Sequence, residues 1–146
     1  MNAFLQSARR ARIRPRLNVI PLAALIAFLA HGELTAQQGR ESATARLAAL
    51  SENMSAAAYP EISRLLRAGA DTEAMNKYGA PPLYMASQNG QSAIVELLID
   101  AKADVNAVNR NGTAPLSIAS AKGRADIAAM LLAAKANVNT ANKDGF

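Results

Sequence analysis

Residues 76–108 read NKYGAPPLYMASQNGQSAIVELLIDAKADVNAV, and residues 109–141 read NRNGTAPLSIASAKGRADIAAMLLAAKANVNTA. The two stretches align without a gap and are identical at 14 of 33 positions. Residues 142–146, NKDGF, start a third copy, and residues 62–71 match the second half of an earlier one. A fixed period of this length indicates a solenoid, in which similar units stack on one another and bury a shared core. The expected fold class is therefore an all-α repeat.

Each copy has the pattern turn, helix, loop, helix, turn. Gly79 and Gly112 lie in turns that are rich in asparagine. Pro82 and Pro115 start the first helix of each copy, because a residue in the first helical turn needs no backbone N–H. Apolar residues at helical spacing then define the second helix. The expected helices are 82–88, 92–101, 115–121 and 125–134.

The two copies resemble the ankyrin repeat family, whose pattern is G-x-T-P-L-H-x-A-A, then a glycine, an apolar helix and G-A-D-V-N-A. This chain has GAPPLYMAS at 79–87 and GTAPLSIAS at 112–120, followed by ADVNA at 103–107 and ANVNT at 136–140. The resemblance implies helix-turn-helix units joined by β-hairpin-like loops, and a surface that binds another protein.

The resemblance extends over a repeat domain of residues 43–146. Its expected parts are an N-terminal cap at 43–75, full repeats at 76–108 and 109–141, and the start of a further repeat at 142–146. The family's glycine before A-D is kept at Gly69 and is replaced by Lys102 and Lys135. A lysine at positive φ costs on the order of 1 kcal/mol relative to glycine, so we expect a less stable array than an idealised one.

The C-terminal face of this array is expected to be uncovered. A terminal repeat normally has a polar outer face, yet no following element covers Ile127, Leu131 and Leu132. Either the natural array continues for one or more repeats, so that this chain is a fragment, or an oligomer partner covers this end.

Residues 1–36 have the three parts of an export signal. Basic residues run to Arg16, an uncharged apolar run extends from Val19 to Ala30, and residues 34–36 supply a small-residue end. An apolar helix of this length measures about 18 Å, which is too short for a hydrocarbon core of about 30 Å. We therefore predict a signal peptide.

The expected cleavage follows Ala36, with residues 30–32 as a second candidate site. Residues 37–42 would then form a short flexible start, and the product would lie in the periplasm of a bacterium. A retained signal anchor and a mitochondrial presequence are the alternatives.

The net charge of +5 is concentrated in the leader. Its first 16 residues contain five arginines, and no acidic residue precedes Glu33. From residue 37 onward there are 11 basic and 10 acidic residues, which leaves no basic field to attract phosphate. We expect no nucleic-acid partner, and membrane contact only through a leader that is not cleaved.

Outside the leader, the chain lacks the side chains that most catalytic and metal sites use. Cysteine is absent, and the only histidine, His31, lies in the leader. Ser-His-Asp triads, Cys-His dyads and histidine-ligated zinc are thereby excluded. Asp71 and Asp104 occupy the repeating turn, where a carboxylate caps backbone N–H groups, and Glu96 and Asp100 share a solvated helix face. We predict no enzyme activity, no catalytic or metal site and no cofactor.

The resemblance implies that binding uses the hairpin tips and the exposed side of the first helix of each copy. The matching positions are Lys77, Tyr78, Ala80, Gln88 and Asn89 in the first copy, and Arg110, Asn111, Thr113, Ala121 and Lys122 in the second. The two copies differ at all five paired positions, whereas framework positions repeat. Tyr78 is the strongest expected anchor because an exposed tyrosine offers a large, stiff contact area, and Arg110 is the second.

These features predict a periplasmic protein-binding module or scaffold that carries out no catalysis. The sequence does not identify its partner protein. The alternatives are a membrane-anchored structural or regulatory ankyrin protein, and an immunity-type inhibitor of a secreted toxin.

Overall fold

The computed structural model describes residues 22–143 and residue 145. The basic stretch of the leader and the first part of its apolar run therefore lie outside the described residues. The chain divides into two compact units, with the boundary between Thr35 and Ala36. The two units are treated separately below.

The described part of the first unit is helical. It belongs to helix α2, Leu22–Leu50, whose remaining residues lie in the second unit. His31 Nδ1 lies 2.5 Å from Ala27 O, and Thr35 Oγ1 donates to Gly32 O over 2.9 Å, so both polar side chains bond to the backbone of their own helix. In the part of the chain that the structure describes, no helix has the length and apolarity needed to span a membrane.

Residues 37–42 differ from the expectation of a flexible start, because they are part of α2. Gln37 Nε2 donates to Glu41 Oε1 over 3.0 Å, and Arg40 Nη2 donates to Gln37 Oε1 over 3.0 Å. Polar pairs three and four residues apart stabilise a helix by a few tenths of a kcal/mol each. The sequence between the leader and the repeats therefore continues the helix.

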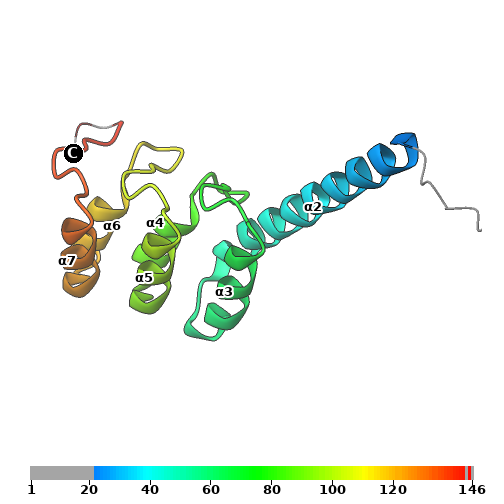
Figure 1. The fold of residues 1–146 in the computed structure, drawn as a ribbon. Helices are drawn as coiled ribbons and strands as arrows, with labels where there is room; N and C mark the ends of the chain where they lie inside the picture. Colours follow the sequence, from blue (N-terminus) through cyan, green and yellow to red (C-terminus); the bar gives the residue numbers. More distant parts are fainter. Residues whose placement is uncertain (1–21, 144, 146) are drawn as a thin grey trace, which may run out of the picture. The chain divides into compact units, whose positions relative to one another are not determined.

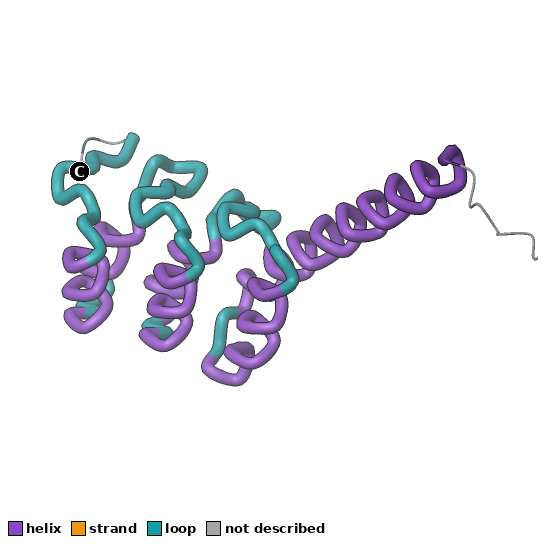
Figure 2. Tube along the Cα trace, viewed as in Figure 1, coloured by secondary structure: helices purple, strands orange, loops and turns teal. Residues whose placement is uncertain are grey.

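The second unit, residues 36–146, consists of helices joined by loops, and the figures show its helix pairs in chain order along a row (Figures 1 and 2). After α2 come η1 (Ser51–Asn53), η2 (Ala56–Ala58), α3 (Tyr59–Arg67), α4 (Pro82–Asn89), α5 (Ser92–Asp100), α6 (Pro115–Ala121) and α7 (Ala125–Ala133). The four helices expected from the repeats are α4 to α7, with bounds that agree to within one residue. The described residues contain no strand, so the all-α repeat is confirmed.

The helices pack both within a repeat and between repeats. The first helix of each repeat contacts its own second helix, as in α4 with α5 and α6 with α7. It also contacts the first helix of the next repeat, as in α4 with α6, while α3, α5 and α7 stack on the other side. Tips formed by the loops project from one end of the helix pairs (Figure 1).

Residues 43–75 form the same kind of unit as the two full copies. The last turns of α2 take the place of the first helix, and α3 takes the place of the second. The turn after the second helix is closed by the same backbone bond in all three units, from Ala70 N to Leu65 O, from Ala103 N to Leu98 O and from Ala136 N to Leu131 O, at 3.1, 3.0 and 2.9 Å. The segment interpreted as a cap is therefore a first repeat of divergent sequence.

The residue that reverses the chain after each second helix has positive φ in all three units. Gly69 has φ +83°, Lys102 has +67° and Lys135 has +65°. The prediction that both lysines replace a left-handed glycine is confirmed. Each lysine is held in a conformation that costs about 1 kcal/mol relative to glycine.

The core runs continuously through the second unit. Its fully buried side chains include Leu47, Ile62, Leu83, Ile94, Leu98, Ile127 and Leu131. The expectation that Ile127 and Leu131 are uncovered is wrong, because both are 0% exposed. They lie one helical turn apart on the side of α7 that packs against α5 and α6. Leu132, which is 48% exposed, agrees with the expectation.

Candidate functional site

The tip of the first full copy is built by one asparagine. Asn76 Oδ1 accepts hydrogen bonds from Tyr78 N over 3.0 Å and from Ala80 N over 3.1 Å. The Asn76 backbone closes the same loop, because its N–H donates to Ala80 O over 3.0 Å and its carbonyl accepts from Gly79 N over 2.9 Å. Gly79 has φ +71°, a conformation that favours glycine. The loop therefore presents Lys77 and Tyr78 at its end.

The second copy repeats this construction. Asn109 Oδ1 accepts from Asn111 N over 3.0 Å and from Thr113 N over 2.9 Å, and Gly112 has φ +79°. This tip presents Arg110 and Asn111, which are both exposed.

Consecutive tips are bonded to one another. Arg110 N donates to Gly79 O over 2.7 Å, and Lys143 N donates to Asn111 O over 3.1 Å. The next side chain also lies on the preceding glycine: a Cβ built on Gly79 would come within 2.8 Å of Arg110 Nε, and one on Gly112 within 3.4 Å of Lys143 Cγ. The tips thus form a continuous surface with a fixed spacing.

The structure brings four of the predicted binding residues together at the tips. Lys77, Tyr78, Arg110 and Asn111 are exposed and belong to adjacent loops. Three more nominated residues, Gln88, Ala121 and Lys122, lie at the far ends of α4 and α6. An eight-residue helix is about 12 Å long, so these residues form a second group, apart from the tips.

Three nominated residues are buried or partly buried in the framework of the repeats. Ala80 is only 4% exposed because its backbone N–H and carbonyl both bond to Asn76, which draws it into the loop. Its nomination as a contact residue is therefore wrong. Asn89 is partly buried, and its Nδ2 donates to Met54 O over 3.2 Å, which links α4 to the first repeat. Thr113 is partly buried in the position that corresponds to Ala80.

A salt bridge restrains the Lys77 side chain. Lys77 Nζ lies 2.5 Å from Glu52 Oε2 and 5.1 Å from the centroid of the Tyr78 ring. The hydrogen bond to Glu52, together with its charge, raises the pKa of Lys77. The Tyr78 side chain beside it is 62% exposed. The sequence did not identify Glu52, because no local pattern relates it to a tip 25 residues away.

The Asp71 and Asp104 side chains have the structural role expected of them. Asp71 Oδ1 accepts from Glu73 N and Asp104 Oδ1 accepts from Asn106 N, each over 2.9 Å. Glu96 and Asp100 are exposed on α5, as expected. In the described part of the chain, no group of three or more potential His, Cys, Asp or Glu ligands is close enough to hold a metal ion.

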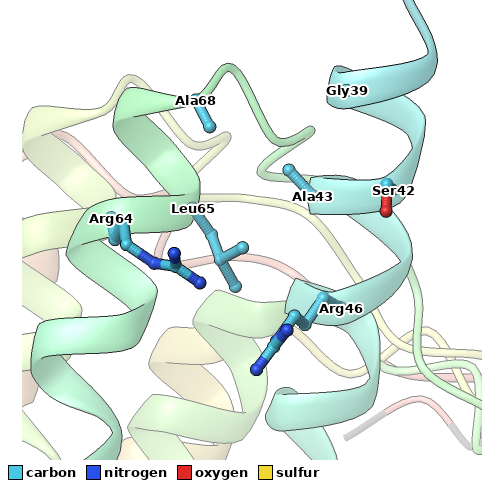
Figure 3. Close-up of a pocket in the computed structure, with 7 residues that line it drawn as sticks. All are labelled: Gly39, Ser42, Ala43, Arg46, Arg64, Leu65 and Ala68. Carbon is cyan, nitrogen blue, oxygen red and sulfur yellow. The ribbon is translucent and has the colours of Figure 1, made fainter.

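A shallow cavity of about 270 Å³ lies between the last turns of α2 and α3 (Figure 3). It was not predicted. Arg46 from α2 and Arg64 from α3 extend into this region, and both bind Glu61, at 2.9 and 2.8 Å. The hydrogen bond from Arg64 and the charge of both arginines lower the pKa of Glu61. Because Glu61 binds both guanidinium groups, neither arginine of this cavity is an unpaired cation.

A row of helix pairs with projecting, mutually bonded tips defines the class of helical repeat proteins, in which each repeat contacts its neighbours along the row. The sequence model for ankyrin repeats (3 copies) matches residues 47–142, and the chain belongs to this family. The three copies agree with the three units in the structure. Ankyrin repeats generally mediate protein–protein interaction and are not themselves catalytic. No curated protein matches the chain.

Proposed function

We propose that this chain is exported to the periplasm of a bacterium and that residues 37–146 act there as a protein-binding module. The module works by surface complementarity and catalyses no reaction. The contrast between the framework and the tips carries the proposal. Framework positions such as Asn76 and Asn109 are identical and bonded alike, whereas the exposed residues beside them, Tyr78 and Asn111, differ in size and chemistry.

The side-chain inventory supports the absence of catalysis. From residue 37 onward the sequence contains neither histidine nor cysteine. The exposed carboxylates Glu96 and Asp100 lie on a solvated helix face, and Asp71 and Asp104 bond to backbone N–H groups. A general acid and base must face a common reacting atom. Glu96 and Asp100 line one surface cavity, but its other lining residues are apolar, and Asp71 and Asp104 lie outside it.

Two features of the leader support export. Five arginines precede an uncharged apolar run, and a small-residue segment ends at Ala36. The boundary between the compact units falls within one residue of the proposed cleavage point. Cleavage after Ala36 would cut α2 and release residues 37–146, which is the second unit without its first residue.

Expression of the full chain with a C-terminal tag in a bacterium that has a periplasm tests the export step. We expect the periplasmic fraction to contain a product whose intact mass corresponds to a start at residue 37. A full-length product in the membrane fraction would support the membrane-anchored alternative. A full-length product in the cytoplasm would overturn the proposed location.

Affinity capture from a periplasmic extract tests the binding step, with the recovered product as bait. The tip variant Tyr78→Ala/Arg110→Ala is compared with a control, Tyr59→Ala/Arg67→Ala, which removes the same side chains from exposed positions of α3. A protein retained by the parent and the control but lost by the tip variant supports the proposed surface. If the captured partner is toxic to bacteria when it is produced without this chain, the result would indicate the immunity-type role.

A further inference from the structure

A basic side chain recurs at the same place in every tip. Lys77, Arg110 and Lys143 are the second residue of their copies, and each follows an asparagine at intervals of 33 residues. We call these three residues the tip row. The residue after each of them varies, being Tyr78, Asn111 and Asp144. Positive charge is therefore repeated at a site where the neighbouring position is variable.

The geometry of the tips holds the tip row in register. Arg110 lies on Gly79 and Lys143 lies on Gly112, and the bonds between tips hold the backbone from which these two side chains project. Because the loop backbone is already ordered, binding orders fewer groups, and this arrangement is suited to recognition.

The members of the tip row differ in the ion pairs that they form among the described residues. Lys77 is paired with Glu52, but within the described residues neither Arg110 nor Lys143 forms an ion pair. Two carboxylates elsewhere in the repeat unit are already bonded: Glu61 binds two arginines, and Asp126 accepts a hydrogen bond from Ser92 Oγ. The exposed Tyr78 ring lies at the neutralised end.

Accepting the proposed function, that the tips bind protein, we infer that the segment they bind is extended and acidic. One of its carboxylates pairs with the Arg110 guanidinium, whose planar fork accepts a carboxylate with two parallel hydrogen bonds. A second carboxylate lies near Lys143, and an apolar side chain of the segment contacts the Tyr78 ring.

The charge balance favours an acidic peptide over a nucleic acid. Residues 37–146 have 11 basic and 10 acidic side chains. A protein that binds nucleic acid typically makes about six to ten phosphate contacts, whereas the tip row has two cations that form no ion pair among the described residues. Two cations suffice for two carboxylates on one segment.

Selection from a random peptide library tests this inference, with the protein in the form recovered from the export experiment as bait. We expect the selected peptides to be enriched in Asp and Glu. Fluorescence anisotropy then measures the affinity of one selected peptide. Arg110→Gln is expected to weaken it about tenfold and Arg110→Lys less, because lysine keeps the charge but loses the fork. Arg67→Gln, which removes the same charge from α3, is the control and should leave affinity unchanged.

Two results would overturn the inference while leaving the proposed function standing: enrichment without acidic residues, or equal affinity of the parent and Arg110→Gln. Tighter binding of a single-stranded DNA of equal length, in competition with the peptide, would also overturn it in favour of a nucleic acid. If no peptide is enriched, the inference fails. The proposed function is then judged separately, by the affinity capture of a protein partner from the periplasmic extract.

Discussion

The side chain of Arg110 lies directly on Gly79 of the preceding repeat. Arg110 N donates to Gly79 O over 2.7 Å, and a Cβ on Gly79 would come within 2.8 Å of Arg110 Nε and 3.0 Å of Arg110 Cβ. Gly79 therefore shapes the tip of its own repeat and also supports Arg110, the proposed contact residue of the next repeat. Stability and recognition are coupled at this point.

Gly79→Ala should destabilise the protein more than Gly123→Ala. Both glycines have positive φ, +71° and +67°, so both substitutions cost about 1 kcal/mol in backbone strain. Only Gly79 is crowded, since nothing lies within 4 Å of a Cβ on Gly123. The displacement of Arg110 adds roughly another 1 kcal/mol. Urea unfolding measures both, and equal losses would show that the contact with Arg110 is loose.

Lys102→Gly and Lys135→Gly should each stabilise the protein. Both lysines occupy the left-handed region, and the equivalent residue of the first repeat is already Gly69. Relief of the strain is worth up to about 1 kcal/mol, reduced by the greater freedom of glycine in the unfolded chain. The midpoint of urea unfolding should rise in each variant and further in the double variant. A fall in the midpoint would mean that the lysine side chains make a stabilising contact.

Leu131→Ala and Leu132→Ala should differ strongly although the residues are adjacent. Leu131 is 0% exposed and Leu132 is 48% exposed. The buried substitution leaves a cavity and should cost about 2–5 kcal/mol, whereas the exposed one should cost less than about 1 kcal/mol. Unfolding free energies of the two variants check this. A large loss for Leu132→Ala would indicate that another molecule covers this face in solution.

Tyr84 should make stability depend on pH in the alkaline range. Burial raises the pKa of Tyr84 above 10.0, and a hydrogen bond with the Asn109 side chain offsets part of this rise. The folded state therefore holds the phenolic proton more tightly than the unfolded state does. The resulting stabilisation is complete below the unfolded pKa and is lost as the pH rises through the folded pKa.

Comparison of the parent with Tyr84→Phe isolates this effect. The phenylalanine variant should lose less stability than the parent between about pH 9 and about pH 11, measured by urea unfolding. Tyr59→Phe, at a position that is 41% exposed, controls for the loss of a hydroxyl group. Parallel pH profiles of the parent and Tyr84→Phe would contradict the argument.

The period of 33 residues was enough to predict the helices, because each expected helix begins at a proline or after a tight loop and carries apolar residues at helical spacing. It also predicted the strained backbone at Lys102 and Lys135, since Gly69 supplies the comparison. The period does not show which side of a helix is buried. Ile127 and Leu131 have the same spacing whether they face the protein core or solvent, and the structure shows that both are buried, on the helix that packs against α5 and α6.

The sequence predicted the site residues whose side chains project from a loop into solvent. It did not predict which nominated residues bond to the framework instead. Tyr78 and Arg110 follow an asparagine that fixes the loop, so their exposure follows from the local sequence. Ala80 is buried by its bonds to Asn76, and Asn89 reaches Met54, 35 residues away. Contacts of that range leave no pattern in one copy of a repeat.

The affinity of the captured partner for three proteins tests the central claim, that the tips bind protein, most directly. The parent, the tip variant Tyr78→Ala/Arg110→Ala and the α3 control Tyr59→Ala/Arg67→Ala are titrated with the purified partner under one salt condition, after each has been shown to unfold cooperatively. The account predicts that the tip variant binds at least about tenfold more weakly, because central aromatic and arginine residues contribute most of the energy of an interface, and that the control matches the parent. Equal affinity of the tip variant and the parent, or a loss confined to the α3 control, would contradict it.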